Sequence, residues 1–167
     1  MPPAPPERAL LTDEQIGTWR ALVAVHARLS VQLEADLVAE HGIPLIEYEV
    51  LVQLLDATDQ RLRMTELADR VVLSRSGITR LVDRMEREGL VERAVCDEDG
   101  RGTYAVLTEG GTARLRQASG TYFRGLRTYL VDRADGSALG VLRSALDPVL
   151  AADPVTGDRE GQPSTSR

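Results

Sequence analysis

The chain has 167 residues, of which 43% are hydrophobic, and this suits one globular domain with an ordinary core. Its apolar runs are far shorter than the roughly 20 residues of a membrane span, and its N-terminus lacks the basic and apolar regions of a signal peptide, so we expect a cytoplasmic protein. The net charge of −6 argues at first against nucleic acid. However, the excess acid lies in residues 1–60, whereas residues 61–104 carry nine arginines and nine acids.

Residues 1–11 begin with a run of prolines and residues 151–167 are rich in Pro, Gly, Ser and Thr, so we expect both segments to be disordered. Thr12, followed three residues later by Gln15, is a capping-box pattern that predicts the start of a helix. An apolar stripe at spacings of three and four then predicts a long amphipathic helix within residues 12–42. The stripe consists of Ile16, Trp19, Val23, His26, Ser30, Leu33 and Leu37.

Residues 43–107 are expected to fold as a lobe of three helices and a hairpin. After a Gly/Pro break, apolar periodicity predicts a helix over residues 45–57. Its buried stripe would be Tyr48, Leu51, Leu54 and Leu55. A short helix is expected to begin at a Thr65 cap, and Ser74 is expected to cap a third helix, residues 74–88.

From Leu90 the hydrophobic residues alternate as in a strand, and the same alternation occurs again over residues 103–107. Between these two segments lies a charged, glycine-containing turn, residues 97–102. Two short strands around such a turn, directly after a helix, indicate a wing over residues 90–107.

Residues 108–150 are expected to form two more helices, the first capped by Thr108 and the second beginning at Ser137. Their inward-facing residues would be Leu115, Tyr122, Leu126 and Tyr129 or Leu130 in the first helix, and Leu139, Leu142, Leu146 and Val149 in the second. The first of these helices contains Gly110, Gly111, Gly120 and Gly125. Because glycine weakens a helix, this one must depend on packing. The expected fold class is therefore mainly α, with six helices and a small β-wing.

The helix over residues 74–88 separates apolar from polar side chains. One side carries Ile78, Leu81, Val82 and Met85, and the other carries Ser76, Thr79, Arg80, Asp83, Arg84 and Arg87. A short helix, a tight turn, a helix with Ser, Thr and Arg in its first turns and then a wing indicate a winged helix-turn-helix that binds DNA. All 20 basic residues are arginine, which suits bidentate contacts to phosphate or guanine. The alternative is a solvated, arginine-rich face of an ordinary helical domain.

Four short segments at fixed spacing add to this pattern: residues 73–86, 89–91, 99–102 and 106–108. With them, and with its helix order from Thr12 to Leu150, the sequence resembles the MarR-type (multiple antibiotic resistance regulator) winged helix-turn-helix transcription factors. The resemblance implies a homodimer joined by the first, fifth and sixth helices. It also implies a recognition helix in the major groove of DNA and a wing in the minor groove.

The resemblance assigns roles to residues by position. Arg80 matches the base-contacting arginine of the family, and Arg101 matches its minor-groove arginine, which Asp99 would orient through an ion pair. Members often carry a second arginine where Gly100 stands, so a lower affinity of the wing is expected here. The predicted DNA-binding residues are Ser74, Arg75, Ser76, Thr79, Arg80, Arg84, Asp99 and Arg101.

Other site patterns carry less weight. Residues 97–100 resemble the start of a calcium loop, but Thr108 stands at its twelfth position, where a bidentate Glu is required. Cys96, the only cysteine, excludes an internal disulfide and is either inert or a peroxide sensor, although sensing branches of the family usually place that cysteine in the first helix. One cysteine and two distant histidines argue against a zinc site. No P-loop, serine elbow or HExxH motif is present, so we expect neither an enzyme nor a cofactor.

The leading hypothesis is a transcriptional regulator, a repressor that binds a pseudo-palindromic operator as a homodimer and is released by a small molecule. In the family such ligands are often aromatic acids or phenols, bound between the dimerisation helices and the DNA-binding lobe. The candidate ligand-binding residues are Trp19, His26 and Tyr48, with plain core packing as the alternative. The second hypothesis is a winged-helix module that binds protein instead of DNA. Its face would more often carry aromatic or aliphatic residues than the Ser, Thr and Arg found here.

Overall fold

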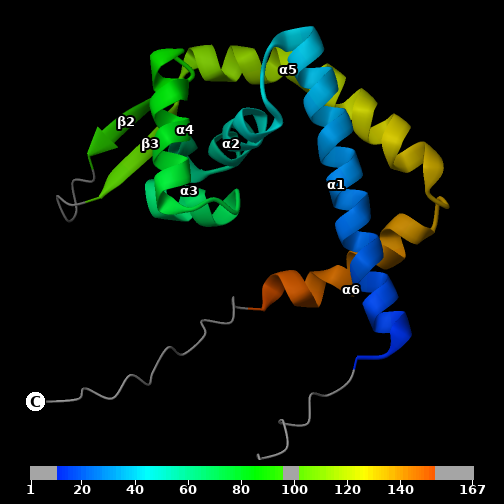
Figure 1. Cartoon of the computed structure of the whole chain (residues 1–167). Helices are drawn as coiled ribbons and strands as arrows, with labels where there is room; N and C mark the ends of the chain where they lie inside the picture. Colours follow the sequence, from blue (N-terminus) through cyan, green and yellow to red (C-terminus); the bar gives the residue numbers. More distant parts are fainter. Residues whose placement is uncertain (1–10, 96–101, 153–167) are drawn as a thin grey trace, which may run out of the picture.

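The computed structural model describes residues 11–95 and 102–152. Its helices are α1 (Asp13–His41), α2 (Leu45–Leu55), α3 (Met64–Arg70), α4 (Arg75–Arg87), α5 (Glu109–Tyr129) and α6 (Ala138–Ala151). Its strands are β1 (Arg61–Arg63), β2 (Val91–Val95) and β3 (Thr103–Leu107), and 3-10 segments cover Thr58–Gln60 and Val131–Arg133. The mainly helical class with six helices is confirmed (Figure 1). Residues 1–10 and 153–167, where we expected disorder, lie outside the described residues.

Helix α1 begins and ends where its sequence predicts. The Thr12 side chain accepts a hydrogen bond from the Gln15 backbone, and the Gln15 side chain accepts one from the Thr12 backbone, so the capping box is complete. Gly42 ends the helix with φ of 62°, a left-handed conformation that glycine adopts without a Cβ penalty. The chain can therefore turn sharply into α2.

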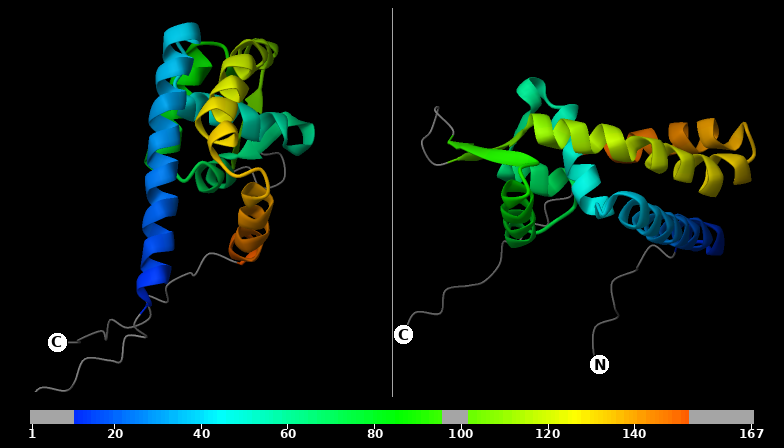
Figure 2. Two further views of the ribbon diagram at one scale, coloured as in Figure 1. Left: turned by 90° about the vertical axis from the view of Figure 1, so that its right-hand side faces the viewer. Right: turned by 90° about the horizontal axis from the view of Figure 1, so that it is seen from above.

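Helices α1 and α5 pack side by side and extend away from the lobe (Figures 1 and 2). Gly125 is buried at this contact, and a Cβ added there would lie 2.6 Å from Leu33 Cδ2. The Tyr129 hydroxyl donates a hydrogen bond of 2.8 Å to Asp36. The Arg124 guanidinium pairs with Glu40 at 2.6 Å and lowers the pKa of that carboxyl. Close approach and polar contacts together fix α5 on α1, as the glycine content of α5 requires.

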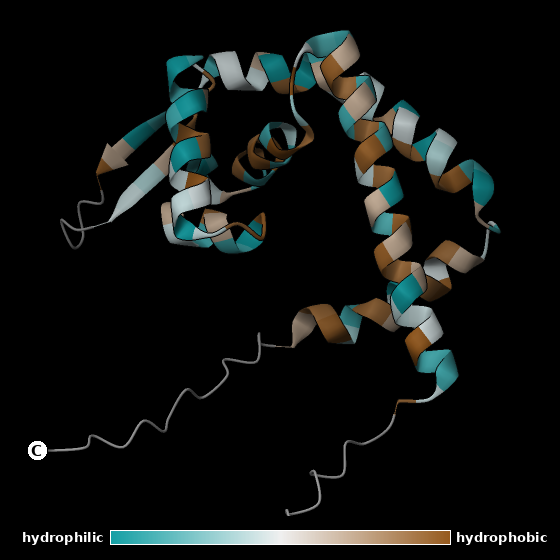
Figure 3. Ribbon diagram, viewed as in Figure 1, coloured by the Kyte–Doolittle hydropathy of each residue, from teal (hydrophilic) through white to brown (hydrophobic). Residues whose placement is uncertain are grey.

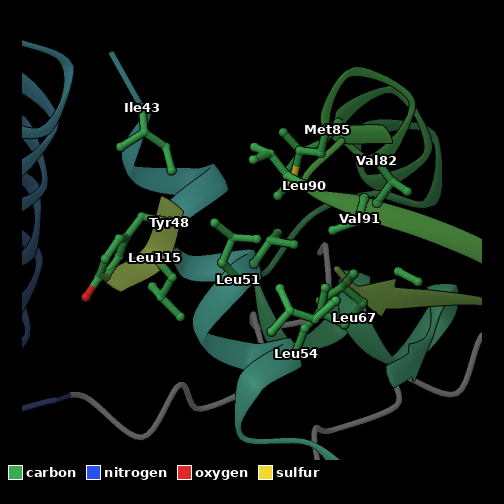
Figure 4. Close-up of a cluster of buried hydrophobic side chains, with 14 of the residues drawn as sticks. Ile43, Tyr48, Leu51, Leu54, Leu67, Val82, Met85, Leu90, Val91 and Leu115 are labelled. Atoms are coloured by element: carbon green, nitrogen blue, oxygen red, sulfur yellow. The ribbon is translucent and has the colours of Figure 1, made fainter. Parts of the chain in front are cut away.

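The lobe has its core between α2, α3, α4 and the sheet. Leu51 and Leu54 of α2, Leu67 of α3 and Met85 of α4 are fully buried, and they converge with Val91 of β2 in Figure 4. Leu55, which we expected in the same stripe, is 42% exposed. It is the last residue of α2 and lies about 100° around the helix from Leu54, away from the core.

The sheet has three strands in the order β1-β3-β2, all antiparallel. The wing strands β2 and β3 pair as predicted, with Val91 opposite Leu107 and Val95 opposite Thr103. Strand β1 was not predicted, because three residues carry too little alternation to be distinguished from a loop. The predicted Thr65 cap is wrong: α3 begins at Met64 with Arg63 as its N-cap, and Thr65 lies inside the first turn.

Apolar side chains on α1 and α6 remain uncovered within the single chain. On α1, Leu33 and Leu37 are buried, but Trp19 is 66% exposed. Helix α6 has no buried residue, and Val149, which we expected to face inward, lies on its surface. In Figure 3, brown hydrophobic segments recur along the ribbons of both helices. Exposed apolar surface of this extent is typical of a protein–protein interface.

Candidate nucleic-acid interface

Helices α3 and α4 are joined by a tight turn of residues 71–74. The Leu73 amide donates to the Ala68 carbonyl at 2.8 Å, and the Ser74 hydroxyl accepts from the Gly77 amide at 3.1 Å, which confirms Ser74 as the N-cap of α4. Val72 has φ of 54° and is 89% exposed. A β-branched residue is strained in this region, so the geometry of the turn is enforced by the helices on either side.

Helix α4 presents two different faces. Ile78, Leu81, Val82 and Met85 are buried against the lobe, as predicted. Arg75, Ser76, Thr79 and Arg80 are exposed on the other side. The Thr79 hydroxyl donates to the Arg75 carbonyl at 2.8 Å and so keeps only its acceptor capacity for a partner. The guanidinium groups of Arg75 and Arg80 form no ion pair or hydrogen bond with the part of the chain that the structure describes.

Arg84 differs from the other arginines of α4 because it pairs with a residue of another helix. Its Nε donates to Glu47 Oε1 of α2 at 2.5 Å, and the Glu47 side chain is buried whereas that of Arg84 is 44% exposed. Burial raises the pKa of Glu47, and the hydrogen bond from Arg84 opposes this rise. The spacing of residues in the sequence gave no sign of this pair. The ion pair between Arg84 and Glu47 ties α4 to α2.

Arg93 of β2 holds the wing against α4. Its guanidinium pairs with Asp83 at 2.5 Å and with Glu86 at 3.0 Å, and it donates to the Thr79 carbonyl at 3.2 Å. Asp83 and Glu86 are thus acids on α4, the predicted recognition helix, and Arg93 compensates their charge within the lobe. This matters for binding, because uncompensated carboxylates beside phosphate would repel it.

A hollow of about 440 Å³ lies between the wing and α4. It is lined by Arg63, Met64, Thr65, Thr79, Arg93, Gly102 and Thr103. Arg63 and Thr65 were not among the predicted site residues. The Arg-Leu-Arg alternation of residues 61–63 is the signal that could have indicated Arg63, since its outward positions are both basic. Asp99 and Arg101 of the predicted wing tip, and Cys96, lie outside the described residues.

A larger cleft of about 1000 Å³ lies between α1, α2, α5 and the turn after α3. His26 and Tyr48 line it, but Trp19 does not. The three residues therefore do not share one pocket, because Trp19 lies about 10 Å before His26 along α1. His26 is exposed, which excludes a core histidine. Tyr48 is buried, donates to Ser119 Oγ at 3.2 Å and stacks on Tyr122 with ring centroids 4.5 Å apart.

Comparison with known proteins decides the family. Residues 41–102 match the model of the MarR family. AbsC, a MarR family transcriptional regulator from Streptomyces coelicolor, is similar over 86% of this chain and 96% of its own, with 34% identity and a TM-score of 0.74. The chain belongs to the MarR family. Sco3205 from the same organism, a MarR-family regulator crystallised in complex with DNA, aligns over 90% of this chain and 96% of its own, with 30% identity and a TM-score of 0.78.

A relative identified by sequence is likewise a helix-turn-helix transcriptional regulator. The HTH-type transcriptional repressor YetL of Bacillus subtilis is 35% identical over 97 residues, which is 58% of this chain and 58% of YetL. Membership confirms the predicted winged helix-turn-helix fold and the prediction of a transcriptional regulator that is not an enzyme. Among residues 11–95 and 102–152, no helix is long and apolar enough to cross a membrane. No group of three or more His, Cys, Asp or Glu in the same ranges is placed to hold a metal ion.

Proposed function

We propose that this MarR-family protein is a cytoplasmic repressor that binds a pseudo-palindromic operator as a homodimer and is released by a small aromatic ligand. The observation that carries DNA binding is the outer face of α4, where Arg75 and Arg80 are exposed and have no partner among the described residues. Arginine without an internal counter-ion is available for phosphate and for bidentate contacts to guanine. Arg80 is the proposed base contact, and Arg75, Ser76 and Arg84 are proposed to contact the backbone. The crystallisation of the relative Sco3205 with DNA supports the proposal that this chain binds DNA.

Replacing Arg80 by alanine is expected to weaken binding to the operator by about 1 to 3 kcal/mol and to relax the sequence preference. Fluorescence anisotropy with the DNA upstream of the protein's own gene, and with point-substituted versions of it, measures both effects. Arg116→Ala is the matched control, because Arg116 is an exposed arginine on α5. If Arg80→Ala and Arg116→Ala bind the operator equally well, α4 is not the recognition helix.

Dimerisation is supported by the uncovered apolar residues of α1 and α6. Two lobes related by a two-fold axis would each read one half-site, with centres about 10 bp apart. Val141 of α6 is 70% exposed in the single chain and would be buried between subunits.

Sedimentation velocity at micromolar concentration is expected to show a dimer for the parent and a monomer for Val141→Asp, because an aspartate buried at the interface would be unpaired. Val95→Asp, at a residue of β2 that is 71% exposed, is the control and should remain dimeric. A monomeric parent protein would contradict both the dimer and the palindromic operator.

Release by a ligand requires that the ligand prefer a dimer geometry whose recognition helices do not match the half-site spacing. The 1000 Å³ cleft supports such a mechanism, because helices that would join the subunits and the turn that precedes α4 both line it. A ligand bound there would contact both halves of the molecule at once. The resemblance suggested an aromatic acid or a phenol as the ligand, and Tyr48 and Tyr122 supply an aromatic wall in either case.

A further inference from the structure

The walls of the cleft between α1, α2 and α5 are mostly apolar. Val31 of α1, Ile46 and Val52 of α2 and Phe123 of α5 line it, together with the stacked rings of Tyr48 and Tyr122. Its volume of about 1000 Å³ is in the range of pockets that hold molecules of drug size. An occupant must therefore have an apolar body, and an aromatic one would find ring partners.

Some of the charged side chains that line the cleft have a partner of opposite charge, and others do not. They are His26 and Glu34 of α1, Glu49 of α2 and Arg70 of α3. Arg70 donates to Glu66 Oε1 at 2.7 Å and to Gln53 at 3.5 Å, so its charge is already neutralised by a carboxylate that is not part of the cleft wall. The carboxylates in the cleft wall are those of Glu34 and Glu49. Glu34 accepts a hydrogen bond of 2.5 Å from the Leu45 amide.

Glu49 is the group that lacks a partner. Its side chain is half-buried, and it forms no hydrogen bond or ion pair with residues 11–95 or 102–152. Burial raises the pKa of this carboxyl, the charge of His26 lowers it, and Glu34 raises it again. A half-buried carboxylate without a partner is costly, and a cation placed beside it removes that cost.

We propose that this cleft binds an organic cation, an ammonium group on an aromatic body, with the Glu49 carboxylate as its counter-ion. The ammonium group would pair with Glu49 while the aromatic body lies against Tyr48 and Tyr122, whose ring faces also attract cations. An aromatic acid would instead bring a third carboxylate next to Glu34 and Glu49. His26 does not reverse this preference, because a single imidazole carries at most one positive charge and the cleft wall holds two carboxylates, Glu34 and Glu49. Binding of the cation does not depend on the proposed function, whereas an effect of the cation on DNA binding does.

Three probes with the same ring system separate charge from shape: 2-(1-naphthyl)ethylamine, 2-(1-naphthyl)ethanol and 1-naphthylacetate. Calorimetric titration of the full chain at neutral pH, without DNA, is expected to show the amine binding at least about tenfold more tightly than the acid, with the alcohol between them. This comparison needs no variant. An acid that binds as tightly as the amine, or more tightly, overturns the proposal.

Glu49→Gln removes the charge and keeps the shape. It is expected to weaken the amine about tenfold and to leave the alcohol within about twofold, so that the two affinities converge. Glu92→Gln, at an exposed glutamate on β2 outside the cleft, makes the same change in net charge and should alter neither affinity. If Glu49→Gln weakens the amine and the alcohol equally, Glu49 only shapes the cleft, and its role as counter-ion is refuted.

Release of operator DNA is measured separately with the same probes. An amine that binds with the expected preference but leaves the operator complex intact contradicts the ligand-release mechanism and still supports the cation site. Release by the acid alone, with no binding of the amine, overturns the cation site and supports the release mechanism.

Discussion

Replacing Gly111 by alanine is expected to lower the free energy of unfolding by about 3 kcal/mol. Gly111 is buried in the first turn of α5, where its Cα lies against the start of the wing. An added Cβ would overlap the carbonyl oxygen of Leu90 and lie 2.8 Å from Leu107 Cδ1. Because the obstacle is backbone, it cannot turn aside as a flexible side chain would, and α5 would have to shift away from the sheet.

Gly120→Ala is the matched control for this prediction. Gly120 belongs to the same helix, but a Cβ there meets nothing within 4 Å. Alanine should therefore raise the free energy of unfolding by about 0.5 to 1 kcal/mol, the usual gain over glycine in a helix. Urea denaturation at one protein concentration measures both variants, since stability of a dimer depends on concentration. A shift of the same sign and size for both would show that Gly111 is not in contact with the wing.

Arg84→Ala is expected to lower the free energy of unfolding by about 3 kcal/mol near neutral pH, because it leaves a buried carboxylate without its partner. The Glu47 side chain is only 3% exposed. Among the described residues, Arg84 is the residue with which it forms an ion pair. Removing the charge of Glu47 as well should relieve part of this loss. The double variant Glu47→Gln/Arg84→Ala is therefore expected to be more stable than Arg84→Ala by about 1 kcal/mol.

The pH dependence gives this prediction a second measurement. Burial raises the pKa of Glu47 in the folded protein above its ordinary value of 4.5, and loss of Arg84 removes the strongest of the interactions that oppose the rise. A raised pKa means that the folded state binds the proton more readily, so the stabilisation is complete below pH 4.5 and is lost as the pH rises through the folded-state pKa. Acidification should therefore narrow the difference between Arg84→Ala and the double variant. A constant difference at all pH values would contradict the buried-charge explanation.

The two variants also separate two roles of Arg84, contact with DNA and attachment of α4 to α2. The sequence predicted only the first. If the double variant regains stability but binds the operator weakly, with a salt slope reduced by about one, Arg84 also contacts phosphate. Normal binding by the double variant would limit Arg84 to holding α4 on α2.

The sequence by itself determined the elements whose signals are local. Thr12, Ser74 and Thr108 each cap the helix that they were expected to cap, because a cap depends on residues within one turn. Helix α4 and strands β2 and β3 also followed from local signals, since their apolar faces are long enough to show 3.6-residue and two-residue repeats. Family membership, too, was visible in short segments around α4 and the wing.

Only the tertiary structure decided which distant residues meet. Glu47 and Arg84 are 37 positions apart, and their pairing depends on how α2 crosses α4. Strand β1 exists because β3 offers it hydrogen-bonding partners, with Leu62 opposite Ala105, and three residues alone do not specify a strand. His26 and Tyr48 share a cleft while Trp19 does not, because a cleft is bounded by the packing of α1, α2 and α5. Helix periodicity places residues on a face, but the neighbouring helices determine what that face contacts.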